Sequence, residues 1–166
     1  MSKDSEDRTH LVLSLVLTLL AGVAQPQTRP DFTGRWVFDQ AKSAQPWNGR
    51  IVIAALLGDE CVVTQDAKAL TLAITFGGQQ VRAVYNFSGE SRNLSPGDIP
   101  VTSRTSWEGE KLVIASTSTS NTKGQTATIE TRRVLWLDTD RNLIIERTGT
   151  PASEVTPSRS VYTRVR

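Results

Sequence analysis

Apolar side chains recur at every second position over long stretches of this chain. Residues 70–76 (LTLAITF) and 81–87 (VRAVYNF) both follow this alternation, which is typical of a strand that buries one face and exposes the other. Gly77 and Gly78 fall between the two stretches and favour a tight turn. The pattern therefore predicts a β-hairpin over residues 70–87.

Strands are predicted over most of the remaining chain as well. Residues 101–107 and 111–120 form a second predicted hairpin, and residues 126–137 and 142–149 form a third. Single strands are expected at three further places, which brings the total to nine: residues 34–39, 60–65 and 159–166.

The segments between these strands are shorter or less regular. Residues 41–50 and 92–100 are predicted loops, and Asp138-Thr139-Asp140 is predicted to make a hairpin turn. The apolar run 51–57 (IVIAALL) is too short for periodicity to separate a helical turn from a buried strand.

These elements predict an all-β fold. No stretch of about 12 residues carries the apolar stripe of an amphipathic helix. The hairpin-length connections favour an antiparallel up-and-down meander. Such a sheet protects its edge strands by closing into a barrel or by stacking as a β-sandwich. We expect the barrel, with the sandwich as the alternative.

The N-terminal segment predicts export. Residues 11–24 (LVLSLVLTLLAGVA) form a run of 14 residues without charge, whereas a helix needs roughly 20 to span a bilayer. Small residues at 22 and 24 suit cleavage after Ala24. We therefore expect residues 1–24 to be a signal peptide, with an uncleaved anchor as the alternative. The mature protein would be secreted or periplasmic, without stable membrane insertion.

Length and composition limit the number of domains and the kinds of partner. The 166 residues suit one domain, which we place at residues 32–166 after a polar linker at 25–31. The 19 basic and 17 acidic side chains give a formal charge of +2, so a nucleic-acid partner is not expected.

Few catalytic groups are present. The only histidine, His10, lies in the predicted signal peptide, and the only cysteine is Cys61. A histidine base, a Cys–His nucleophile and a Cys/His zinc site are therefore excluded from the mature chain. Glu130 and Glu146 lie on strands expected to pair, but a solvated charge ladder is the simpler interpretation. We expect no catalytic residues, metal or cofactor, and hence no enzyme.

Two short motifs carry a resemblance. The segment 32–36 (FTGRW) begins the first predicted strand, and the chain ends in VYTRVR. The opening resembles the Gly-x-Trp strand of the calycin superfamily, which contains the lipocalins, the fatty-acid-binding proteins and the avidins. Both ends are also similar to those of small exported bacterial proteins that open with Phe-x-Gly-x-Trp and end with Tyr-x-Arg.

This resemblance implies a structural role for three residues. Trp36 would close one end of a barrel, and Gly34 would allow close backbone approach beside it. Arg164 would pack across the indole ring, a cation–π contact worth roughly 0.5–2 kcal/mol.

A ligand site is predicted from the apolar phase of the strands. Tyr85, Trp107 and Trp136 fall on that phase and are expected to line the interior. Arg132 continues the face of Trp136, and Arg147 continues the face of residues 143 and 145. Inside a barrel, two guanidinium groups suit the anionic head of a small apolar or amphipathic ligand.

Two alternatives remain open. Both arginine strands can emerge into solvent at that end, or a bulge can reverse their phase. The protein can also be an envelope interaction protein, with an interior filled by side chains and no small ligand.

Overall fold

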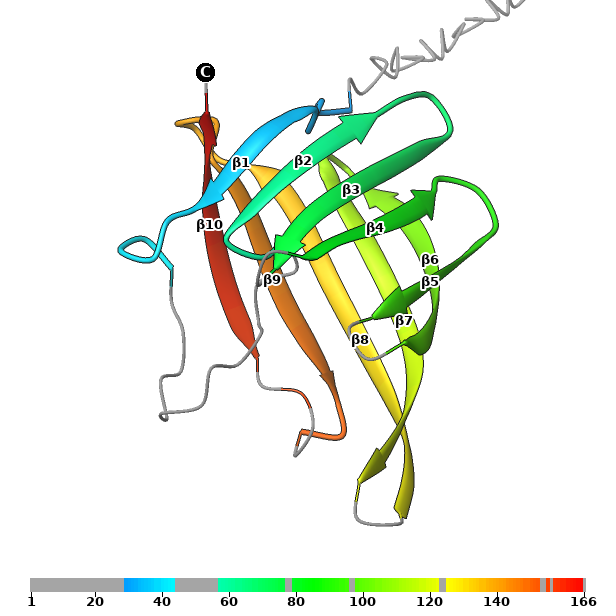
Figure 1. Cartoon of the computed structure of the whole chain (residues 1–166). Coiled ribbons are helices and arrows are strands. Elements are labelled where there is room, and N and C mark those ends of the chain that lie inside the picture. The colour runs from blue at the N-terminus through cyan, green and yellow to red at the C-terminus, as the bar shows by residue number, and fades with distance from the viewer. Residues whose placement is uncertain are drawn as a thin grey trace, which may run out of the picture.

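The computed structural model describes residues 29–43, 57–76, 79–95, 98–122, 125–152, 155 and 157–165 (Figure 1). Within these ranges the chain forms ten β-strands and no helix. The strands are β1 (Gly34–Phe38), β2 (Glu60–Gln65), β3 (Ala69–Phe76), β4 (Gln79–Asn86), β5 (Glu90–Ser95), β6 (Ile99–Glu108), β7 (Lys111–Thr122), β8 (Gln125–Leu137), β9 (Leu143–Thr150) and β10 (Ser158–Val165). The described residues thus contain no helix long and apolar enough to cross a membrane.

Several sequence predictions fall outside the described residues. The predicted signal peptide, most of the linker and almost all of the apolar run 51–57 lie there. Leu57 is the described residue of that run, and its side chain is fully buried in the core.

The three predicted hairpins are confirmed. β3 pairs with β4, β6 with β7, and β8 with β9, each antiparallel. The β8–β9 turn is held by one carboxylate, because the oxygens of Asp138 accept hydrogen bonds from the backbone N–H of Asp140 and from both the N–H and the side-chain amide of Asn142. The Asp-rich segment is therefore a turn, as its sequence predicts.

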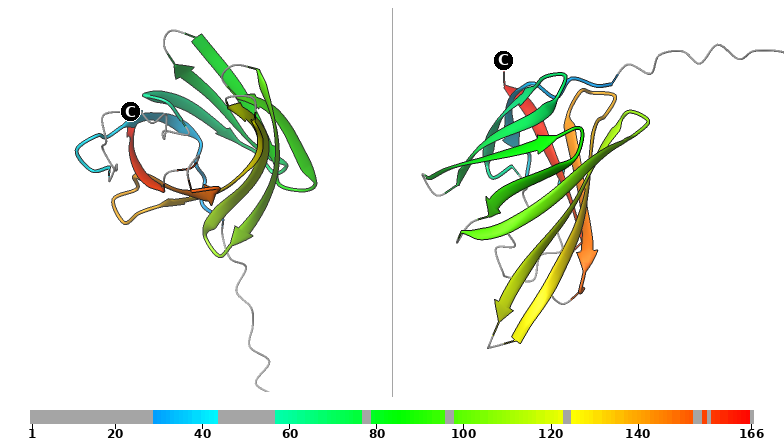
Figure 2. Two further views of the ribbon diagram at one scale, coloured as in Figure 1. Left: turned by 90° about the horizontal axis from the view of Figure 1, so that it is seen from below. Right: turned by 90° about the vertical axis from the view of Figure 1, so that its right-hand side faces the viewer.

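All ten strands belong to one sheet, so the predicted antiparallel meander is confirmed and the sandwich is not observed. The order is β4-β3-β2-β1-β10-β9-β8-β7-β6-β5. β1 pairs with β10 through residues Arg35 to Phe38. The first and last strands of the chain are therefore neighbours in the sheet. Viewed along its axis, the sheet curls into a nearly closed barrel (Figure 2).

One seam, between β4 and β5, lacks a backbone ladder, and side chains bridge it instead. The Asn93 amide on β5 accepts a hydrogen bond from the N–H of Val84 and donates one to the Val84 carbonyl. The Ser91 hydroxyl accepts from the N–H of Asn86, and Thr105 Oγ1 donates to the Asn86 carbonyl. An amide side chain here satisfies the groups that a neighbouring strand would otherwise satisfy.

β5 corrects the predicted loop over residues 92–100. Its inward positions are Ser91, Asn93 and Ser95, while Arg92 and Leu94 point outward. This strand therefore has no apolar face, and the hydrophobic alternation on which the prediction relied is missing from it.

Apolar side chains fill the end of the barrel near Trp36. Phe32, Trp36, Leu72, Leu112 and Tyr162 are completely buried there. These five side chains have no exposure to water, so no space of water size lies beside them. The core therefore occupies this end of the barrel as a solid layer.

Candidate functional site

The Trp36 end is closed in the way that the sequence predicts. The guanidinium carbon of Arg164 lies 4.8 Å from the centre of the Trp36 ring, and the indole N–H donates to the Phe32 carbonyl at 2.8 Å. A Cβ on Gly34 would approach Arg164 Nε to 3.1 Å, and the Gly34 φ is +151°. Glycine is therefore needed beside this cation–π contact.

Two arginines face each other inside the barrel. Arg133 on β8 and Arg147 on β9 are register partners. They share the inward face with Leu135 and Ile145, which pair one step nearer the Trp36 end and belong to the core. Partners directly opposite on antiparallel strands have Cβ atoms about 4.5–5.5 Å apart. The two arginine side chains thus leave the sheet from neighbouring positions at the border of the core.

Neither of these arginines has an ion pair within the described part of the chain. The Nε atoms of both are buried without a hydrogen-bond partner. Arg133 Nη1 makes one long contact, of 3.4 Å, to the Tyr85 hydroxyl on β4. Burial, and next the positive charge of Arg133, lower the pKa of Arg147 below its ordinary value. Partly buried cations without an ion-pair partner carry a desolvation cost.

The surroundings of the pair change from apolar to polar along the barrel. On the side away from Trp36, the next inward positions are Ser116 on β7 and Thr131 on β8, which are register partners. Ser103 on β6 adds a hydroxyl, 2.9 Å from that of Ser116. The pair therefore separates an apolar layer from a layer of hydroxyl groups.

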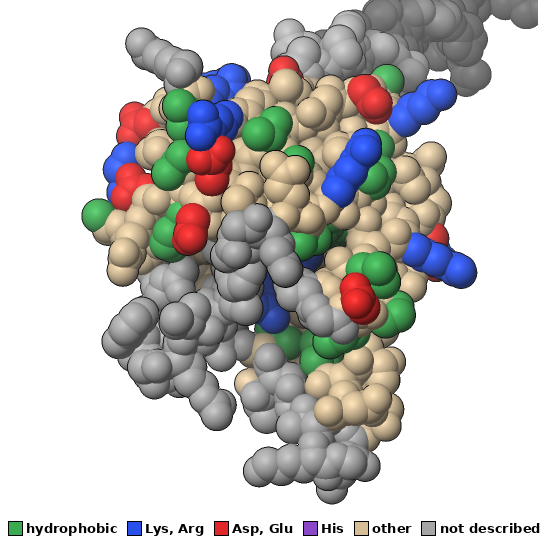
Figure 3. All heavy atoms as spheres, in the orientation of Figure 1, with side chains coloured by type: hydrophobic (Ala, Val, Ile, Leu, Met, Phe, Trp, Pro, Cys, Tyr) green, Lys and Arg blue, Asp and Glu red, His purple; other side chains and the backbone are tan. Residues whose placement is uncertain are grey.

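No acidic residue occupies an inward position on the described strands. The strands contain five glutamates and no aspartate, and the alternation set by the registered pairs places each of these glutamates on the outer face. The inward charges are those of Arg133 and Arg147, with Arg164 at the Trp36 end. The inward face of the described strands is consequently positive, while their outer face carries both signs. On the face shown in Figure 3, basic atoms lie in a hollow near the centre, beside apolar atoms.

Arg132 and Trp136 are not in the interior, so the predicted phase of β8 is wrong. Arg132 points outward and makes two hydrogen bonds to the Glu108 carboxylate, at 2.8 and 3.0 Å. Trp136 also lies outside, with Lys111 Nζ 4.7 Å from its ring centre. The error has a physical cause: Val134 is buried as well, on the outer face. Both phases of β8 are partly apolar, so periodicity alone does not identify the inward one.

The other predicted lining residues point inward. Tyr85 is buried and lies against Arg133. Trp107 is partly buried, stacks on Phe32 with ring centres 6.1 Å apart, and packs against Phe87 at 5.6 Å. Of the predicted site residues, Tyr85 and Arg147 therefore lie at one site. Arg133 also belongs to this site, although the sequence did not identify it. Trp107 belongs to the core near the Trp36 end.

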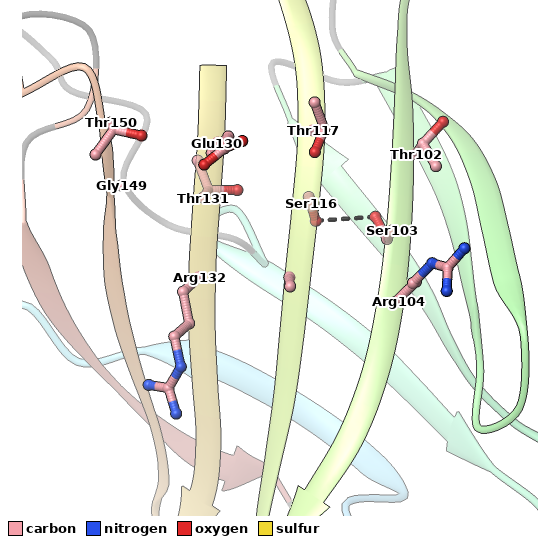
Figure 4. Close-up of a pocket in the computed structure, with 11 residues that line it drawn as sticks. Thr102, Ser103, Arg104, Ser116, Thr117, Glu130, Thr131, Arg132, Gly149 and Thr150 are labelled. Carbon is pink, nitrogen blue, oxygen red and sulfur yellow. Dashed lines mark hydrogen bonds between the residues drawn. The ribbon is translucent and has the colours of Figure 1, made fainter. Parts of the chain in front are cut away.

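A groove of about 440 Å³ runs over the outer face of β6 to β9. Figure 4 shows its residues, with Arg104 and Arg132 extending in opposite directions. Each of these arginines has a carboxylate partner, Glu90 for Arg104 and Glu108 for Arg132. The guanidinium groups of Arg104 and Arg132 therefore point apart, and each has a carboxylate partner. Arg133 and Arg147 have no such partners.

The expected charge ladder between β8 and β9 is only partly present. Glu130 is opposite Thr150, and Glu146 is opposite Val134. The two glutamates are four positions apart along β8, about 13 Å at the rise of a strand. Glu146 instead lies 4.0 Å from Arg159, and Arg147 points inward. These carboxylates are too far apart to act on one substrate bond together.

Chemistry at other polar groups is limited. Within the described ranges, no three His, Cys, Asp or Glu side chains gather where they would hold a metal ion. Cys61 is buried, and this burial raises the pKa of its thiol to about 12. The thiol is therefore protonated and shielded at neutral pH.

No protein-family model matches the chain, and no curated protein matches it either. A barrel of this kind is compatible with many activities, so function has to be inferred from the side chains themselves.

Proposed function

We propose that this protein is an exported, non-catalytic β-barrel that binds a small anionic ligand in its interior. The ligand's anionic group would lie between Arg133 and Arg147 and accept charge-assisted hydrogen bonds from both guanidinium groups. Tyr85 would border the same site through its hydroxyl group.

The unpaired arginine pair carries this proposal. Two like charges opposite each other on neighbouring strands destabilise a sheet, and partial burial without a counter-ion adds to that cost. The inward face of the described strands supplies no carboxylate to offset it. An anion from solution would offset this cost. The pair is therefore better explained as a binding site than as a group that stabilises the fold.

Export is the second part of the proposal. It rests on the uncharged run of residues 11–24 and the small residues before a cut after Ala24. Sequencing the N-terminus of protein from its native host tests it. A mature chain that starts at Gln25 supports export, and a chain that keeps Met1 and needs detergent for extraction contradicts it.

An interaction protein without a ligand is the second candidate. The solid apolar layer at the Trp36 end favours it, because a barrel filled with side chains can present its outer face or loops to a partner. In that case the inward arginines would be silent in any assay of small-molecule binding.

Binding of two anionic ligands separates these candidates. The protein is titrated with inorganic phosphate and with a fluorescent fatty-acid analogue. We expect at least one to bind, and Arg147→Gln to weaken it about tenfold or more, which corresponds to roughly 1.4 kcal/mol per tenfold. Arg132→Gln is the matched control, since its side chain is next to Arg133 in sequence but lies outside. Absence of binding by both ligands would favour the interaction protein.

A further inference from the structure

The arginine pair lies on a boundary between two layers of the barrel interior. Toward Trp36 the next inward residues on the same strands are Leu135 and Ile145, and both are buried. Away from Trp36 they are Thr131 and Gly149, and Thr131 is partnered by Ser116 on β7. The two sides of the pair therefore offer different surroundings to a bound molecule.

The apolar side has no room for a long hydrocarbon tail. Leu112, Leu135, Leu143 and Tyr162 are at most 1% exposed, so their layer is packed without gaps of water size. A tail entering this layer would have to displace side chains of the core. A ligand body attached to the anionic group must then lie on the other side of the pair.

That other side is rich in hydroxyl groups. Ser103 and Ser116 are buried and hydrogen-bonded to each other, so they form a packed polar wall. Thr131 is half-buried and is the partly accessible hydroxyl group next to them. Ser158 on β10 is the register partner of Arg147 and is half-buried. Hydroxyl groups donate and accept hydrogen bonds, so they suit a polar ligand body and pair poorly with an alkyl chain.

The charge of the pair points to a particular class of head group. Arg133 and Arg147 together carry two positive charges, and no acidic side chain on the described strands faces them. A monoanion would leave one charge uncompensated in a partly buried site, whereas a dianion would compensate both. Guanidinium groups also match the spacing of phosphoryl and carboxylate oxygens.

We infer that the interior site selects a compact dianion, a phosphoryl group or two neighbouring carboxylates on a small polar body, over a long-chain monoanion. This inference rests on the proposed function and narrows its ligand. Val155, which is fully buried, fills the position beside Gly149, because a Cβ on Gly149 would come within 2.3 Å of the Glu130 carbonyl oxygen and 2.8 Å of Val155 Cγ1. The body of the ligand would therefore lie beside Thr131 and Ser158 and would have to be small.

Competition between defined anions tests the inference. Full-length mature protein is titrated calorimetrically with inorganic phosphate, glycerol phosphate, succinate, acetate and decanoate in a buffer free of other oxyanions. We expect glycerol phosphate or succinate to bind at least tenfold more tightly than acetate and decanoate. Arg133→Gln and Arg147→Gln should each weaken this binding about tenfold or more, and Arg132→Gln should leave it unchanged.

The outcomes separate this inference from the function on which it rests. Decanoate bound more tightly than every dianion, and weakened by Arg147→Gln, would keep the anion site and overturn the selection of a compact dianion. Equal binding of a dianion by wild type and both inward variants would overturn the arginine site. If no anion binds, the proposed function itself fails. Circular dichroism of each variant checks that the fold is retained.

Discussion

At the residue scale, the arginine site and the Trp36 contact depend on side chains whose orientation is set by strand pairing. Arg164 was predictable as the partner of Trp36 because the resemblance at the two ends of the chain placed it there. Arg133 was not, because Arg132 and Arg133 are adjacent in sequence and only the phase of β8 decides between them. The strand pairing decides the phase, because Arg133 is the register partner of Arg147 on the inward face. A sequence with apolar residues on both faces of a strand leaves such a choice open.

Gly34→Ala is expected to lower the free energy of unfolding by about 1–3 kcal/mol, the usual cost of a strained backbone conformation. The Gly34 φ of +151° disfavours a side chain, and the new methyl group would press on Arg164. Gly89→Ala is the control, because Gly89 has a φ of +79° but no atoms within 4 Å of a Cβ. Chemical denaturation measures both. Equal losses of unfolding free energy in the two variants would contradict a contribution from the contact with Arg164.

At the element scale, hairpins are predictable and the seam is not. The β3–β4, β6–β7 and β8–β9 hairpins follow from alternation and turn residues within short stretches of sequence. β5 has polar residues on its inward face and so carries no such signal. The pairing of β1 with β10 joins residues far apart in the chain, and only the resemblance indicated it. The side-chain bridge between β4 and β5 depends on single hydrogen bonds, which no periodicity reveals.

The bridging role of Asn93 gives a prediction for the seam. Asn93→Ala removes two hydrogen bonds and leaves the Val84 N–H and carbonyl without partners. We expect a loss of about 1–3 kcal/mol of stability and faster hydrogen exchange of the Val84 amide. Ser95→Ala is the control, because the Ser95 hydroxyl only contacts the Ile99 carbonyl of its own hairpin, at 3.4 Å. Unchanged exchange at Val84 in Asn93→Ala would contradict the bridge.

The β8–β9 turn gives a prediction for pH. Burial acts to raise the pKa of Asp138, but hydrogen bonds from Asn142 and Asp140 outweigh it and hold this pKa below its ordinary value. The folded pKa is then lower than the unfolded one, of about 3.9. The contribution to stability is present above the unfolded pKa and is lost as pH falls through the folded pKa.

Asp138→Asn should therefore reduce stability at neutral pH and make it less dependent on pH below about 4. Asp140→Asn is the matched control, because the Asp140 side chain is exposed and makes none of these turn contacts. Denaturation at a series of acidic pH values measures the difference. A wild-type protein whose pH dependence equals that of Asp138→Asn would contradict the role of this carboxylate.

At the scale of the whole molecule, the barrel separates charge by side. Acidic residues of the described strands lie outside, where Glu60 pairs with Arg35 and Glu108 with Arg132. Two arginines lie inside without such partners. Surface ion pairs contribute little to stability, whereas an unpaired inner charge subtracts from it. We propose that the protein keeps this inner charge because it binds an anion.

Thermal unfolding with and without an anion tests this claim most directly. The midpoints of wild type and of the double variant Arg133→Gln/Arg147→Gln are measured in oxyanion-free buffer and again with glycerol phosphate or succinate. Without anion, we predict that the double variant is at least as stable as wild type. With anion, we predict that only wild type is stabilised, by about 2.7 kcal/mol when the anion concentration is 100 times the Kd. A double variant that is less stable without anion, and that gains as much as wild type when anion is added, would contradict the claim.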